Sequence, residues 1–444
     1  MVVPFWNLAA ALKLGHFWFK KILWAVVRYT TALLCMMESN FLKQLFQQEF
    51  TKIVAVISKR FGLQHIEIAE DIVSETFLLA TESWQTKGLP ANPNAWLYSV
   101  AKQKTLSHFR RNKIFEDKVV PEIHQNQIAA DYTDEFSFTQ ENIKDSQLKM
   151  LFAICTPAIA SEAQIGLALR ILCGFGIEEI AEAFLSNKET INKRLFRAKE
   201  KLRTEKIQLE LPSEKEIVKR LDNVLHIIYL LFNEGYYSKT QNEILRKDLC
   251  VEALRLALML STYEKTNVPK TNALIALICF HSSRFDARHS IDGEFILYEQ
   301  QNEKLWNQAL INQGIYFLNL SADGDQLTSY HIEAKIAQWH CAKADTVEKW
   351  EQILQLYDRL LAVNYSPGAA LNRTFALYKA KGPKTALTEA KKLNLTDNHF
   401  YYALLGELYK DMDRQKAIAN FQRAQALAKS SLERETIQRK INML

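Results

Sequence analysis

Two segments of the sequence combine clustered cations with apolar residues, an arrangement suited to binding nucleic acid. Residues 96–113 contain no acidic residue and five basic ones, which are Lys102, Lys104, Arg110, Arg111 and Lys113. Unopposed cations beside aromatic side chains suit a phosphate backbone and unstacked bases. A solvated basic helix face is the alternative interpretation.

The second segment, from Ile177 to Arg203, contains two short helical patterns separated by a turn. Ser186 with Glu189 three residues later is a capping box, which predicts that the second helix begins at Asn187. One side of this helix is apolar and consists of Ile191, Leu195, Ala198 and Leu202. Another side is cationic and consists of Lys193, Arg194, Arg197 and Lys201. This pattern predicts a helix-turn-helix whose second helix enters the DNA major groove.

Position along the second helix predicts which residues contact bases and which contact phosphates. We expect the first turns to reach base edges, through Lys188, Thr190, Asn192 and Lys193. Arg197 and Lys201 are expected to meet phosphates, and Arg194 belongs to the same DNA-facing side. A basic amphipathic helix of an ordinary bundle is the alternative.

No residue pattern predicts covalent chemistry. The sequence has no GxxxxGK loop, no HExxH pair and no nucleophile or paired-carboxylate motif. His281, Asp286 and His289 can be arranged as a metal-ligand set, although helix-packing histidines are the favoured interpretation. The cysteines lie far apart and predict a reduced, cytoplasmic protein: Cys35, Cys155, Cys173, Cys250, Cys279 and Cys341. We therefore predict no enzyme, no metal and no cofactor.

The composition predicts a largely α-helical chain of two or three domains, because 444 residues include 48% hydrophobic residues but only 13 Gly and 9 Pro. The formal charge of +6 is mild, so a nucleic-acid surface must be a local patch. Apolar residues recur at helical spacing over residues 41–84. Gly62 is expected to end one helix, and the Gly and Pro residues of segment 88–93 to precede another that starts near Asn94.

Residues 115–146 are predicted to form an acidic linker. Eight acids accompany two lysines there, namely Glu116, Asp117, Glu122, Asp131, Asp134, Glu135, Glu141 and Asp145. Weak apolar periodicity and this charge favour an acidic linker between two basic modules, and simple solubility is the alternative reason for the acids.

Residues 1–37 are rich in Trp, Phe and Leu but do not predict a membrane span. Four cations, Lys13, Lys20, Lys21 and Arg28, leave no uncharged run near the ~18 to 20 residues that a bilayer crossing needs. An interfacial anchor and a poor signal sequence stay open. The favoured interpretation is an over-called translation start, because Met36 and Met37 directly precede an ordinary helical pattern, and no membrane is required as a partner.

Three motifs, in this order, resemble those of an extracytoplasmic-function (ECF) sigma factor: AEDIVSETFLLATESW, WLYSVAKQKTLSHFRR and EEIAEAFLSNKETINKRLFRAKEKLR. The resemblance implies an all-α protein with a sigma region 2 bundle at residues 38–114 and a region 4 helix-turn-helix at 147–209. It also implies two partners, core RNA polymerase and promoter DNA. Promoter recognition and melting would be the function, with the nucleotide chemistry left to polymerase.

The resemblance also implies roles for individual residues. The residues expected to dock on core polymerase are Asp71, Ile72, Glu75 and Phe77. The residues expected to contact the minus-ten element are Gln103, Lys104, Ser107, Arg110 and Arg111. The second helix of region 4 would read the minus-thirty-five element. The chain departs from the family where Gln103 and Ser107 stand in place of the usual Asn and Asp, so its base preference is open.

The remaining chain is predicted to be a helical extension at residues 214–340, followed by tetratricopeptide-like (TPR-like) repeats at 341–444. The repeat pattern rests on Tyr402, Leu405, Gly406, Tyr409, Ala417, Phe421 and Ala424. The segments LLFNEGYYS and DGEFILYEQQNEKLW are similar to those of an ECF subgroup with a long C-terminal extension, except that Gln301, Asn302 and Glu303 replace its QDR run. That resemblance implies an extension that regulates the sigma module, with repeats that can bind a protein or peptide regulator.

Two other classes stay open. One is a stand-alone helix-turn-helix transcriptional regulator, and the other is a helical-repeat adaptor that does not bind polymerase. The helix that contains Asp71 separates them from a sigma factor, because neither class needs both a polymerase-docking surface and a basic melting helix.

Overall fold

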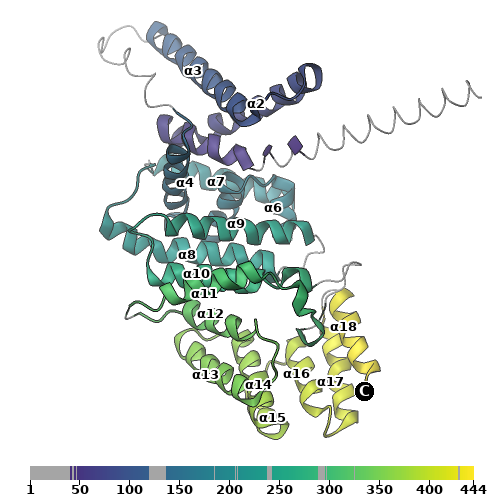
Figure 1. Cartoon of the computed structure of the whole chain (residues 1–444). Coiled ribbons are helices and arrows are strands. Elements are labelled where there is room, and N and C mark those ends of the chain that lie inside the picture. Colours follow the sequence, from purple (N-terminus) through teal and green to yellow (C-terminus); the bar gives the residue numbers. More distant parts are fainter. Residues whose placement is uncertain are drawn as a thin grey trace, which may run out of the picture. The chain divides into compact units, whose positions relative to one another are not determined.

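In a computed structural model of the chain, the described residues are 41–42, 45–46, 48–119, 137–184, 186–205, 207, 209–237, 243–288, 296, 298–324, 326–428 and 431–444 (Figure 1). Within these ranges the chain forms helices joined by turns and contains no strand. The predicted all-α class is confirmed. The predicted segment 1–37 and residues 120–136 of the predicted linker lie outside the described residues.

The chain divides into two compact units. Unit 1 comprises the described residues up to Ile154 together with Gly166–Ile180 and Asn192–Glu210, and unit 2 comprises Cys155–Ile165, Ala181–Ile191 and Leu211–Leu444. The helices from the start of unit 1 to the helix-turn-helix are a helix over residues 48–61, η1 (Leu63–His65), α2 (Ile66–Lys87), α3 (Pro93–Val119), α4 (Gln140–Ile154), α5 (Ser161–Leu167), the π-helical η2 (Ala168–Leu172), α6 (Ile177–Ala183) and α7 (Lys188–Thr204).

Glycines end two of these helices, as the sequence predicts. Gly62 has φ 91° and its N–H donates to the Ser58 carbonyl at 2.8 Å, closing the helix over residues 48–61. Gly88 has φ 80° and its N–H donates to the Trp84 carbonyl at 2.9 Å, closing α2. Left-handed backbone of this kind favours Gly.

The predicted linker is partly helical. Helix α3 continues to Val119, and α4 begins at Gln140, so both helices enter the segment predicted to be a linker. Helix α4 forms there because Ile143 is buried and Thr139 caps the helix, its hydroxyl accepting from the Asn142 N–H at 3.2 Å. Asp145, one of the predicted tether acids, pairs instead with Lys59 at 2.6 Å.

Unit 2 is a succession of helices in which most pack against the next one along the chain. The helices are α8 (Glu214–Tyr237), α9 (Glu243–Ser261), α10 (Pro269–Ser282), η3 (Phe285–Ala287), η4 (Tyr298–Gln300), η5 (Glu303–Leu305), α11 (Gln308–Leu320), α12 (Ser329–Trp339), α13 (Val347–Val363), α14 (Pro367–Lys381), α15 (Pro383–Leu393), α16 (His399–Tyr409), α17 (Arg414–Leu427) and α18 (Ser431–Asn442). Helix α10 is central, since it contacts α8, α9, α11 and α12, and all ten residues from Thr271 to Phe280 are buried.

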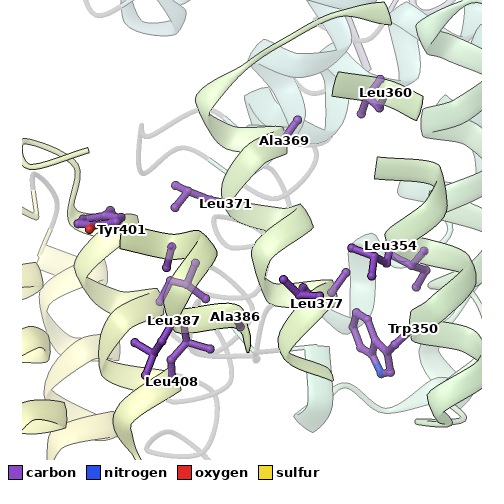
Figure 2. Close-up of a cluster of buried hydrophobic side chains, with 14 of the residues drawn as sticks. Trp350, Leu354, Leu360, Ala369, Leu371, Leu377, Ala386, Leu387, Tyr401 and Leu408 are labelled. Carbon is purple, nitrogen blue, oxygen red and sulfur yellow. The ribbon is translucent and has the colours of Figure 1, made fainter. Parts of the chain in front are cut away.

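Helices α12 to α16 share one apolar cluster, part of which is drawn in Figure 2, and α17 and α18 contribute to a second one. Trp350 and Leu354 of α13, Leu377 of α14 and Leu408 of α16 are all buried in the first cluster. The residues of the TPR-like pattern lie on α16 and α17, where a Cβ at Gly406 would be 2.8 Å from the Phe421 ring. A small residue is therefore required at Gly406 for these helices to approach. Assignment of the repeats to the TPR type remains a prediction.

A carboxyl group lies half-buried between α8 and α12. Glu333 accepts a hydrogen bond from the Tyr229 hydroxyl at 3.0 Å, and no ion pair to Glu333 is found among the described residues. Burial raises the pKa of Glu333 to about 7. Burial and then the nearby Tyr229 hydroxyl raise the pKa of Tyr330, with Glu333 and Asp222 adding smaller effects.

We predict that Glu333 makes the stability of unit 2 depend on pH. The folded chain holds a proton at Glu333 up to about pH 7, whereas an unfolded carboxyl loses it near the ordinary value of 4.5. The contribution of Glu333 to the free energy of unfolding is therefore complete below about pH 4.5 and is lost as the pH rises through about 7. The loss amounts to at most about 3 kcal/mol. The melting temperature of Glu333→Gln minus that of the parent should therefore be larger at pH 8 than at pH 5.

The exposed Glu348→Gln on α13 is the matched control, and its melting temperature should follow that of the parent at every pH. A constant difference between Glu333→Gln and the parent at pH 5 and pH 8 would contradict the prediction.

Candidate nucleic-acid and polymerase-binding surfaces

Helix α3 presents one continuous polar stripe. Four of the five predicted minus-ten residues are exposed at spacings of three or four: Gln103, Ser107, Arg110 and Arg111. The opposite side is buried, with Leu97, Ala101 and Thr105 all at 0% exposure, and the Thr105 hydroxyl donates to the Ala101 carbonyl at 2.7 Å. Arg111 Nε donates to the Ser107 carbonyl at 3.3 Å, which leaves its remaining guanidinium nitrogens directed outward from the helix backbone.

The fifth predicted minus-ten residue, Lys104, is engaged with a residue predicted for another partner. Its Nζ lies 2.8 Å from Glu75 Oε2 of α2, and both side chains are partly exposed. The hydrogen bond and charge of Lys104 lower the pKa of Glu75, so this carboxyl group is ionised at neutral pH. The pair thus joins the two predicted interaction surfaces at the α2–α3 contact.

The four residues predicted for polymerase docking do not share one surface. Asp71 and Glu75 are exposed on α2, but Ile72 is 5% exposed and Phe77 is 6% exposed. The Phe77 ring packs edge-on against Phe46 at 4.9 Å. Ile72 and Phe77 therefore hold α2 in its bundle, and direct contact with a partner is limited to the exposed residues.

Two exposed leucines, which the sequence analysis did not single out, lie beside the exposed acids of α2. Leu78 is 61% exposed and Leu79 is 39% exposed. Four consecutive apolar residues, FLLA, cannot all lie on one buried side of a helix. This run was the feature of the sequence from which the exposed leucines could have been predicted. We name the exposed side chains of Asp71, Glu75, Leu78 and Leu79 the α2 face.

Helix α7 has the two sides that the sequence predicts. Ile191, Leu195, Ala198 and Leu202 are buried at 1 to 4% exposure. Of the predicted minus-thirty-five residues, Arg194 is half-buried and the others are exposed: Lys188, Thr190, Asn192, Lys193, Arg197 and Lys201. We name these exposed side chains the α7 stripe. Lys201 also pairs with Glu205 at 2.9 Å, an exposed contact that DNA phosphates can replace.

The start of α7 differs from the prediction by one residue. Asn187 Oδ1 accepts from the Thr190 N–H at 2.7 Å, so Asn187 caps a helix that begins at Lys188. Asn and Ser are similarly effective at this position, and the sequence SN offers both in succession. Phe196 is 57% exposed on the same helix and was not anticipated.

A buried carboxylate, also missed in the sequence, joins α2 to η2 and α7 within unit 1. Glu70 is 5% exposed and contacts Arg170 Nε of η2 at 3.0 Å and Lys199 Nζ of α7. The Arg170 guanidinium also lies 5.3 Å from the Phe50 ring centroid and donates to the Phe175 carbonyl at 3.2 Å. We name Glu70, Arg170 and Lys199 the Glu70 triad.

The described residues provide no metal site and no membrane span. No group of three potential metal ligands occurs among them, and Asp286 pairs with Lys247 at 2.9 Å. His281 packs on Tyr236 at 4.5 Å, which agrees with the helix-packing interpretation, and His289 lies outside the described residues. In the described part of the chain, no helix combines the length and apolar character that crossing a membrane requires.

Comparison with known proteins bears on both halves of the chain. Residues 45–114, which include α2 and α3, match the model of sigma-70 region 2, and residues 220–322 match a family of unknown function, DUF6596. The chain is 32% identical over 391 residues to "Uncharacterized protein R00370" of Rhizobium meliloti (strain 1021), covering 86% of this chain and 91% of the relative. The chain belongs to the same family as this rhizobial protein. The match of residues 45–114 to sigma-70 region 2 supports a sigma-factor role for this chain in promoter recognition by RNA polymerase. No solved structure matches this chain significantly.

We predict that loss of Glu70 loosens the packing of α2 against α7. In Glu70→Ala, Arg170 and Lys199 lose their buried counter-charge, which costs on the order of 3–5 kcal/mol. Hydrogen exchange of peptides from α2 and α7 should then be faster by at least about 100-fold.

Glu75→Ala, which removes an exposed ion pair from the same helix, is the control, and it should alter exchange by less than about fivefold. Equal protection in the Glu70 variant and the parent would mean that the triad does not hold these helices together.

Proposed function

We propose that the chain is an ECF-type sigma factor that binds core RNA polymerase through the α2 face and promoter DNA through α3 and α7. The observation that carries the proposal is the presence of two different interaction surfaces on one matched region 2 bundle. The α2 face offers acids beside exposed leucines, whereas α3 offers a stripe of polar and basic side chains. A protein that only binds duplex DNA has no use for the first surface.

In the proposed mechanism, the chain contributes recognition and polymerase contributes chemistry. The α7 stripe positions the complex at the minus-thirty-five element, with early residues at base edges and Arg197 and Lys201 at phosphates. On α3, Gln103 and Ser107 receive bases released from the opened minus-ten element while Arg110 and Arg111 contact the backbone. Capture of unstacked bases stabilises the open duplex.

The proposal assigns residues 38–114 to region 2 and 147–209 to region 4, joined by the acidic linker. The extension at 214–340 and the TPR-like helices at 341–444 are proposed to regulate the sigma module. Exposed faces on the C-terminal helices suit a protein or peptide regulator. A cytoplasmic site of action follows from the proposed partners, core polymerase and promoter DNA.

A stand-alone helix-turn-helix regulator is the second candidate, and the α7 stripe supports it as well as it supports a sigma factor. Polymerase binding is the property of the sigma factor that the stand-alone regulator lacks and that can be measured most directly. A binding experiment with core enzyme therefore separates them.

We predict that the chain co-elutes with purified bacterial core RNA polymerase and that Asp71→Arg abolishes this complex. The reversed charge would stand at the N-terminal end of the α2 face, where an attractive contact becomes repulsive. Gel filtration of the mixture, with the bound fraction read from stained gels, is the measurement.

Glu141→Arg makes the same charge change at an exposed position on α4 and should leave co-elution intact. Co-elution of Asp71→Arg at the parent's level would remove the α2 face from the interface. Absence of binding by the parent itself would favour the stand-alone regulator.

We predict that Arg197→Ala weakens binding to a promoter fragment and lowers the slope of log Kd against log salt concentration by about 1, because one phosphate contact is lost. Lys335→Ala, at an exposed position on α12, should change neither quantity. An unchanged slope in Arg197→Ala would exclude this side chain from the DNA interface.

A further inference from the structure

Two cations are buried in one neighbourhood of the extension. Arg284, just after α10, is 7% exposed, and Lys349 of α13 is 3% exposed. Neither cation makes an ion pair within the described part of the chain, although buried Arg and Lys are ordinarily paired with a carboxylate. The nearest available acid, Asp345, is engaged with Lys379 at 2.6 Å and with the Trp350 indole N–H.

Both cations lie near the same aromatic ring, that of Tyr298 in η4. The Arg284 guanidinium and Lys349 Nζ each lie 5.4 Å from its centroid, and Lys349 Nζ also donates to the Tyr298 hydroxyl at 3.1 Å. The rings of His340 and Trp306 lie 5.3 and 6.3 Å from that of Tyr298. We name this group the Tyr298 cluster.

Donors in this cluster are left without acceptors. Arg284 Nε and Trp306 Nε1 are buried and have no hydrogen-bond partner among the residues that the structure describes. Lys349 Nζ donates to the Ala342 carbonyl as well as to Tyr298. Two N–H groups without acceptors and two cations without a directly paired carboxylate thus lie in one region of the described chain. Buried donors of this kind destabilise a folded chain unless something accepts from them.

The pKa values of two neighbouring histidines are lowered in part by the same cations. Burial, and then the charges of Arg284 and Lys349, lower the pKa of His340 to about 3. Burial, and then the charges of Arg284 and Arg288, lower the pKa of His281 well below its usual value. Both imidazoles are neutral at pH 7, so they add hydrogen-bonding atoms but no further charge.

We infer that the Tyr298 cluster is the binding site of a small oxyanion-bearing molecule, held through its phosphate or carboxylate group by Arg284, Lys349 and Trp306. An oxyanion supplies the missing counter-charge and accepts from both free N–H groups. The guanidinium fork matches two oxygens of such a group, and the aromatic rings suit an apolar body attached to it.

This inference goes beyond the proposed sigma-factor function and does not depend on it. Arg284 and Trp306 fall within residues 220–322, which match the family of unknown function, and Lys349 follows on α13. Binding can therefore be measured without polymerase or DNA, and failure of either test leaves the other unaffected.

The test uses the full chain with sodium phosphate and sodium succinate as probes, each compared with sodium chloride at equal ionic strength. We expect at least one probe to raise the melting temperature above the chloride control and to bind saturably by calorimetry. Phosphate alone would identify a phosphate site, and succinate alone would identify a carboxylate site. No stabilisation by either probe would overturn the inference and assign the cluster to buried water.

Arg284→Met separates binding from structural support. For a ligand site, the variant in chloride melts at or above the parent's temperature, because an unpaired buried charge is gone, and its affinity for the probe falls about 10- to 100-fold. A lower melting temperature with undiminished probe binding would make Arg284 structural and overturn the assignment. Lys335→Met, exposed on α12, is the control and should bind like the parent.

Trp306→Phe gives a second, gentler test that applies even if Arg284→Met fails to fold. It removes one N–H donor and keeps an aromatic ring. Affinity for the probe should fall about three- to tenfold. Unchanged affinity in Trp306→Phe would remove this indole from the site and contradict the arrangement inferred.

Discussion

One buried carboxyl group, that of Glu70, links α2 to η2 and α7 within unit 1. Glu70 is 5% exposed, and the opposing charges of Arg170 and Lys199 compensate for the burial of its carboxyl group. An apolar contact between the same helices would be satisfied in many registers. The Glu70 triad has a defined geometry, and it therefore fixes where α2 and α7 meet as well as holding them together.

Given that contact, the surfaces follow from which side of each helix is already used. Helix α7 buries Leu195 and Ala198 and leaves Arg197 outward, and α3 buries Ala101 and Thr105 and leaves Gln103 and Ser107 outward. In both helices the side proposed to bind DNA is the side that the core does not need. The exposed side chains are therefore free to vary with a partner, while the buried ones are constrained by packing.

Local patterns predicted local structure well. Helical periodicity located the buried side of α7, and Gly62 and Gly88 end helices where the sequence indicates, because each depends only on neighbouring residues. The linker boundary was less well predicted, since the acids of residues 140–146 suggested a linker up to residue 146 whereas Ile143 and the Thr139 cap place the start of α4 at Gln140.

Partners far apart in sequence could not be predicted in the same way. Arg170 and Lys199 lie 100 and 129 residues from Glu70, and no spacing rule relates them. Resemblance assigned Ile72 and Phe77 to docking without regard to which side of α2 faces inward, and burial corrects that assignment. The Tyr298 cluster draws on η4, α13 and the end of α10, so its charges become visible only when the chain is folded.

The ion pair between Glu75 and Lys104 has an evolutionary consequence. In the proposed role, one member belongs to the polymerase-facing surface and the other to the promoter-facing surface, 2.8 Å apart. A substitution selected at either position releases or repels the other. Changes in polymerase compatibility and promoter preference are therefore expected to covary across the family, with positions 75 and 104 exchanging charge together.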